Sequence, residues 1–73
     1  MRGLNLDVIV YQVRRRALIN KKKMDVLVVS RYYDCCIDVA ASRALAYPGI
    51  SYDIFEVNLV TGDEHMIERF LID

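Results

Sequence analysis

The stretch DCCIDVAASRALAYPG, residues 34–49, contains the helical pattern of a chain that elsewhere favours strands. From Ile37 onward, apolar residues recur at spacings of three and four, which is the repeat of one helix face. The alanines among them combine high helix propensity with little bulk, so the helix can pack closely on a sheet. We predict that Asp34 caps the helix N-terminus and that the Pro-Gly pair ends it. The predicted helix covers residues 34–47.

The segments on both sides of this helix are rich in β-branched and aromatic residues, which is typical of strands. We predict two strands before the helix and two after it, over residues 4–13, 24–33, 50–60 and 66–72. Residues 14–23 contain the reversal between the first two strands, and Thr61-Gly62-Asp63 is a hairpin signal, because glycine accepts the positive φ that a tight turn needs.

These elements predict an α+β fold, as a single two-layer domain of order ββαββ. A mostly antiparallel four-stranded sheet would carry one helix on one face. A chain of 73 residues has room for one domain, here residues 1–73, in which an N-terminal strand and basic hairpin (1–23) precede a βαββ core (24–73).

The apolar residues of the strands exceed what one helix can cover. We expect Ala41 and Ala44 of the helix to lie against Phe55 and Val57, and the opposite sheet face to be apolar as well. Large exposed apolar patches are rare on monomers, so we expect a homodimer packed through this second face or along a strand edge. The residues of the candidate dimer or partner face are Tyr11, Tyr32, Tyr52, Ile54 and Ile67.

The formal net charge is zero, but the charges are unevenly divided along the chain. Residues 1–31 contain eight basic and two acidic side chains, and residues 32–73 contain two basic and eight acidic ones. Such a division is typical of a basic surface for an anionic partner, or of two halves that pack together and neutralise each other. The candidate anion or partner contacts are the basic residues of the first hairpin, Arg14, Arg15, Arg16, Lys21, Lys22 and Lys23.

Catalytic, metal and cofactor chemistry finds little support in the residue pattern. Cys35 and Cys36 at the helix N-terminus could form a nucleophile with His65 as base, but cysteine is more often a buried small apolar residue. Four zinc ligands are not available, and the three glycines are too far apart for a phosphate-binding loop. We therefore expect no enzyme, no cofactor and no metal site.

No apolar run approaches the roughly 20 residues that a membrane span needs, and the N-terminus does not resemble a signal peptide. We expect a cytoplasmic protein.

The pattern from Val28 to Asp34 (VVSRYYD), followed by an alanine-rich helix, an aromatic strand and Thr61-Gly62-Asp63, resembles small phage- and prophage-type βαββ accessory proteins. The resemblance covers residues 24–73. It implies a small factor that acts by contact, such as an inhibitor of a host enzyme or of a defence system, in the host cytoplasm. It contains no catalytic motif that could be carried over to this chain.

Two functions are therefore compatible with the sequence. The first is a non-catalytic protein–protein interaction module, an inhibitor or adaptor acting on a host or defence protein. The alternative is a nucleic-acid-binding protein that uses the basic hairpin of residues 14–23, with tyrosines of the sheet stacking on bases. A pI of about 6.5 is far from the basic value typical of nucleic-acid binders, which favours the first function.

Overall fold

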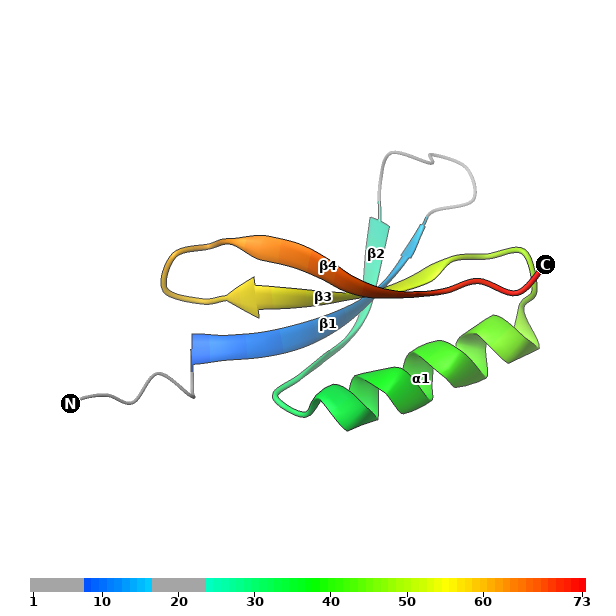
Figure 1. The fold of residues 1–73 in the computed structure, drawn as a ribbon, viewed down its shortest axis with the longest axis horizontal. Helices are drawn as coiled ribbons and strands as arrows, with labels where there is room; N and C mark the ends of the chain where they lie inside the picture. The colour runs from blue at the N-terminus through cyan, green and yellow to red at the C-terminus, as the bar shows by residue number, and fades with distance from the viewer. Residues whose placement is uncertain (1–7, 17–23) are drawn as a thin grey trace.

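A computed structural model describes residues 8–16 and 24–73 of the chain. These residues form the strands β1 (Ile9–Arg16) and β2 (Met24–Ser30), the helix α1 (Tyr33–Ala46), and the strands β3 (Tyr52–Asn58) and β4 (Glu64–Phe70). The α+β class and the order ββαββ are thus confirmed (Figure 1).

The strands form one sheet in the order β2-β1-β3-β4, and each neighbouring pair is antiparallel. The first strand of the chain therefore lies inside the sheet, and β2 and β4 are its edges. Because β2 and β3 both run antiparallel to β1, they run parallel to each other. The helix α1 connects them and packs on one face of the sheet, which gives the two layers (Figure 1).

Both ends of α1 are fixed by backbone geometry. The N-cap is Tyr32 and no side chain caps the helix, so the prediction that Asp34 caps it is wrong; Asp34 lies in the first turn, where its charge favours the helix dipole. After Ala46 the chain turns through Gly49, at φ +89°. The Gly49 amide donates to the Ile72 carbonyl at 2.6 Å, which ties this turn to the segment that follows β4.

The predicted hairpin between β3 and β4 is confirmed. The side-chain oxygen of Asn58 accepts hydrogen bonds from the amides of Val60, at 2.9 Å, and Thr61, at 3.0 Å. Gly62 then adopts φ +81°, which a residue with a Cβ rarely adopts. The turn thus combines an asparagine that satisfies free amides with a glycine at the left-handed position.

The core lies between α1 and the sheet. The helix contributes small side chains to it, and the sheet contributes larger ones from β1 and β3. Close packing of small on large residues lets one short helix exclude water from the centre of the sheet. The fully buried members of this cluster are Val13, Cys36, Ala40, Ala44, Tyr52 and Ile54.

The expected orientation of β3 is wrong. We expected Phe55 and Val57 under the helix, but Tyr52 and Ile54 lie there, with 1% and 0% of their surfaces exposed. Successive residues of a strand point to opposite faces, so Phe55 and Val57 lie on the face away from α1. Both alternating sets are apolar, and the sequence pattern therefore fits either orientation equally well.

The candidate dimer or partner face is corrected for the same reason. Tyr52 and Ile54 belong to the core, and Tyr11 is partly buried against that core with its ring 5.4 Å from the ring of Tyr33. Tyr32 and Ile67 are exposed, with 70% and 41% of their surfaces accessible. The five candidates are therefore divided between core and surface and do not form one outward face.

Ala44 is 1% exposed and packs in the core cluster. We expect Ala44→Leu to lower the free energy of unfolding by about 1–3 kcal/mol, because the added methylenes have no space between helix and sheet. Thermal or urea unfolding of the variant measures this loss. Ser42→Leu, on an exposed position of the same helix, is the matched control; equal midpoints for the two variants would contradict this placement of α1.

Candidate functional site

The face of the sheet opposite α1 is the candidate site, and we call it the open face. The strand register defines it, because residues directly opposite each other on antiparallel strands point to the same side. Arg14 lies opposite Val26 on one side and Asp53 on the other, and Phe55 lies opposite Met66. The described residues whose side chains the register places on this face include Gln12, Arg14, Val26, Val29, Asp53, Phe55, Val57, Glu64, Met66 and Arg69.

Arg14 occupies the middle of the open face. Its guanidinium carbon lies 4.1 Å from the centre of the Phe55 ring, which is the geometry of a cation–π contact. The guanidinium donates to Gln12 Oε1 at 2.9 Å, and its Nη2 lies 2.8 Å from Glu64 Oε1. Only 14% of the Arg14 side chain is exposed. Three neighbours from three strands thus hold this arginine over the sheet.

A second ion pair connects β3 and β4 on the same face. Asp53 is 1% exposed and accepts two hydrogen bonds from Arg69, each at 3.0 Å, and one from the Ser51 hydroxyl at 2.6 Å. Burial acts to raise the pKa of Asp53, but the hydrogen bonds from Arg69 and Ser51 outweigh it and hold the pKa below its ordinary value. The carboxylate is therefore a stable anion, matched by a bidentate arginine.

Apolar side chains flank the two ion pairs. Val26, Val29 and Met66 are 50%, 57% and 45% exposed, although each lies on a strand. Phe55 is partly buried beneath Arg14, and Val57 is buried beside it. The open face therefore presents apolar surface around arginines whose charges are already compensated.

The predicted basic cluster is only partly described, and its described members do not gather on one face. Arg14 lies on the open face, whereas Arg15 points to the side of α1, where its Nη2 lies 2.7 Å from Asp25 Oδ2. Arg16 is exposed at the end of β1. Successive strand residues alternate in direction, so Arg14 and Arg15 lie on opposite faces of the sheet. The candidates Lys21, Lys22 and Lys23 lie outside the described residues, and the role of the basic hairpin stays a prediction.

An ion pair between Arg14 and Glu64 joins the basic and the acidic halves of the chain. The pairs Arg15–Asp25 and Asp53–Arg69 each form within one half of the sequence. The Arg14–Glu64 pair lies on the open face, where β1 and β4 side chains meet over β3.

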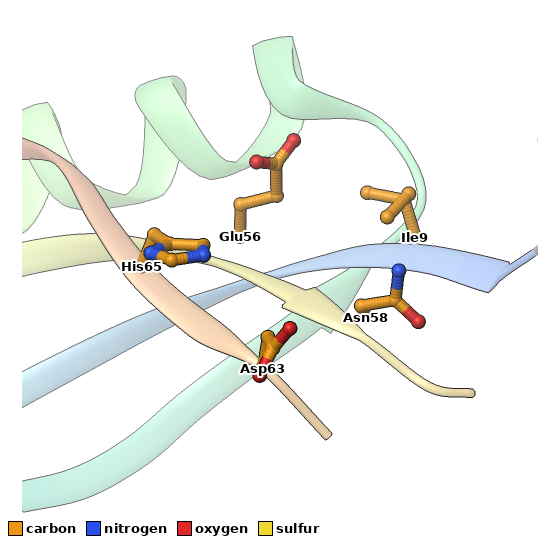
Figure 2. A pocket seen from close by; sticks show the side chains of 5 residues that line it. All are labelled: Ile9, Glu56, Asn58, Asp63 and His65. Carbon is orange, nitrogen blue, oxygen red and sulfur yellow. The ribbon is translucent and has the colours of Figure 1, made fainter. Parts of the chain in front are cut away.

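The two cysteines at the start of α1 lie in different environments, and His65 lies on another element. Both are free thiols; Cys35 is exposed and Cys36 is fully buried in the core. Burial raises the pKa of the Cys36 thiol, with a smaller contribution from Cys35, and this disfavours the thiolate that a nucleophile requires. His65 lies on β4, where it lines a hollow at the hairpin end of the sheet (Figure 2).

We expect the two cysteines to differ in their effect on stability. Cys36→Ser should lower the free energy of unfolding by about 1–3 kcal/mol, because it places a hydroxyl in an apolar core. Cys35→Ser at the exposed neighbour should change it by less than about 0.5 kcal/mol. Urea unfolding of both variants tests this, and a larger loss for Cys35→Ser would show that the helix phase is wrong.

The hollow beside His65 was missed by the sequence analysis. It has a volume of about 200 Å³ and is lined by Ile9, Glu56, Asn58, Asp63 and His65 (Figure 2). Glu56 and His65 are direct cross-strand neighbours, a pairing set by the β3–β4 register and not by either residue's position along the chain. The hollow is smaller than typical ligand pockets of about 300–1,000 Å³, and its Asn58 oxygen is already bonded to the turn.

Among residues 8–16 and 24–73, no group of three or more histidine, cysteine or acidic side chains could hold a metal ion. No helix within these ranges is long and apolar enough to cross a membrane. Comparison with known proteins finds no matching family model, curated protein or solved structure. The inference of function therefore rests on the open face.

Proposed function

We propose that the protein is a non-catalytic interaction module that binds a partner protein through the open face. The observation that carries this proposal is the arginine–aromatic cluster: Arg14 lies over the Phe55 ring and is paired with Glu64, next to exposed valines and a methionine. Aromatic residues, methionine and arginine are enriched at the centres of protein interfaces, and arginine is a frequent hot-spot residue.

The energetics of the cluster favour a protein partner. A charge that is already paired and largely desolvated costs less to cover than a free one, because its partner stays with it on binding. A side chain that three neighbours hold in place also loses less conformational entropy in a complex. The partner surface that fits is apolar at its centre, since Val26, Val29 and Met66 are exposed, and has charges of both signs at its rim to meet Glu64 and Arg69.

An inhibitor or adaptor that acts on a host or defence protein, as the phage-type resemblance implies, would use such a contact. The nucleic-acid alternative has less support among the described residues. Arg14 and Arg15 each have a carboxylate partner with which a phosphate would have to compete. Tyr52 is buried and Tyr11 packs against Tyr33, so neither ring is free to stack on a base.

Affinity capture from cell lysate tests the proposal, with and without nuclease treatment and with protein identification by mass spectrometry. The test variant is Val29→Glu on the open face, and the control is Leu45→Glu on α1, where the side chain is 70% exposed. We expect wild type and Leu45→Glu to retain the same protein after nuclease treatment, and Val29→Glu to lose it. Circular dichroism confirms that both variants are folded.

Two results would overturn the proposal. One is a captured protein that Val29→Glu retains as well as the wild type does. The other is capture that nuclease abolishes and that falls steeply with salt, since the release of condensed counterions identifies binding to phosphates.

A further inference from the structure

The outer edge of β4 carries a charge pattern that is complementary to itself. The strand reads EHMIERF over Glu64–Phe70, all but its last residue are exposed, and it lies at the end of the sheet order. An edge strand has a row of backbone groups without strand partners, and it pairs readily with another strand unless something prevents it. The side chains of β4 then determine which strand can pair with it.

A bulge in β4 determines which face each of its side chains occupies. The register places Ile54 opposite Glu68 and Phe55 opposite Met66, so Ile67 is an extra residue between them. On the C-terminal side of the bulge, Arg69 lies on the open face and Glu68 on the helix side. On the N-terminal side, Glu64 and Met66 lie on the open face and His65 on the helix side.

Two copies of β4 can pair in an antiparallel fashion about a two-fold axis normal to the sheet, provided that opposed residues lie on the same face. Three pairings follow in one register: Glu64 with Arg69 of the second copy, His65 with Glu68 of the second copy, and Met66 with Ile67 of the second copy. Glu64 and Arg69 share the open face, and His65 and Glu68 share the helix side. Symmetry forms each pairing twice.

The register that places Ile67 opposite Ile67 of the second copy does not put opposed residues on the same face. In that register Met66, on the open face, lies opposite Glu68, on the helix side. His65, on the helix side, lies opposite Arg69, on the open face. In a strand without the bulge, the complementary register would oppose residues from different faces, because an odd offset changes the side. Because of the bulge at Ile67, the residues that are opposed in the complementary register lie on the same face of the sheet.

We propose that a second copy of this chain pairs with β4 in the complementary register, so that the four strands of each copy join in one continuous sheet. The central contact is apolar, between Met66 and Ile67 of the second copy, which are 45% and 41% exposed in the single chain. On both sides of it Glu64 lies opposite Arg69 of the second copy, and His65 lies opposite Glu68 of the second copy. Glu64 and Arg69 each also have an ion-pair partner within their own chain. This inference does not depend on the proposed function, although it would place two open faces side by side.

Sedimentation equilibrium across a hundredfold concentration range, on the full chain, measures the pairing. We expect the mass to rise from 8.5 kDa towards twice that value. In a dimer of the His65→Glu variant, the new carboxylate lies opposite Glu68 of the second copy, and symmetry forms this repulsive pairing twice. The variant should therefore raise the dimer Kd by about tenfold. Adding Glu68→Lys to that variant places opposite charges at both pairings and should return the Kd to near the wild-type value. Ser42→Glu, an equal charge change on exposed α1, should leave the Kd unchanged.

Amide hydrogen exchange provides a measurement that does not depend on any variant. In wild type, the protection of β4 amides should increase with protein concentration while that of β2 amides stays constant. A constant mass of 8.5 kDa, a Kd that His65→Glu does not change, no rescue by Glu68→Lys, or concentration-dependent protection of β2 instead of β4 would each overturn this proposal. Because Val29 is not on β4, the capture experiment can fail while this one succeeds.

Discussion

Replacing Ile54 by alanine is expected to lower the free energy of unfolding by about 4 kcal/mol, the largest effect of any single truncation considered. Ile54 is 0% exposed and lies on β3 in the cluster that includes Val13 of β1 and Ala40 of α1. The variant loses the transfer free energy of three methylene-sized groups and leaves a cavity that a rigid sheet cannot close. Urea unfolding followed by circular dichroism measures the loss.

The matched control is Val29→Ala on the open face. Val29 is 57% exposed in the single chain, so its truncation should change the free energy of unfolding by no more than about 0.5 kcal/mol. If the two variants lost similar stability, the assignment of Ile54 to the covered face and of Val29 to the open face would be contradicted.

The second large effect is expected at the Asp53–Arg69 ion pair. Arg69→Gln should lower the free energy of unfolding by roughly 3 kcal/mol at neutral pH, because it leaves the buried Asp53 carboxylate without its bidentate partner. The Ser51 hydroxyl remains as a donor, so the loss is not that of a fully isolated charge. The measurement is the difference in unfolding free energy between wild type and variant.

The pH dependence of that difference identifies its cause. In wild type the pKa of Asp53 is lowered, so its contribution is fully present above the unfolded value of about 3.9 and is lost as the pH falls through the folded pKa. Without Arg69, burial raises the pKa of Asp53. Protonation at low pH then removes the buried, unpaired carboxylate that destabilises the variant. The stability difference should therefore shrink as the pH falls. In an Asp53→Asn background, Arg69→Gln should have a small effect that is independent of pH; a full loss there would contradict the ion-pair explanation.

The element order could be predicted from the sequence because each signal is local. Alanines spaced at three and four, followed by a Pro-Gly pair, placed a helix over 34–47, and the structure has it over Tyr33–Ala46. The glycine of the second hairpin located the turn between β3 and β4. The N-cap was not predictable in the same way, because the helix begins after Tyr32 and no side chain caps it.

The sheet faces and the site could not be predicted, because they depend on pairings between distant residues. Tyr52 and Ile54 alternate with Phe55 and Val57, and both sets are apolar, so periodicity alone does not choose which set meets α1. The cluster around Arg14 forms only because β1 lies next to β3 in the sheet. This strand order brings Arg14 of β1 within reach of Glu64 on β4. From residue types alone, Arg14 is one of several basic residues of the first hairpin, and its contacts with Phe55 and Glu64 are not predictable.

The bulge at Ile67 is a further example. Nothing in the sequence EHMIERF marks an extra residue, and without it the faces of Glu68 and Arg69 would be exchanged. The β3–β4 register reveals the bulge and with it the self-complementary edge.

Site-specific photo-crosslinking in nuclease-treated lysate tests directly whether the open face binds a protein. A photoreactive residue is placed at Val29 on the open face or at Leu45 on α1, both of which are exposed. The open-face proposal predicts a crosslinked partner polypeptide from position 29 and none from position 45. Crosslinks to nucleic acid in untreated lysate with no polypeptide product, or a polypeptide product from position 45 alone, would contradict it.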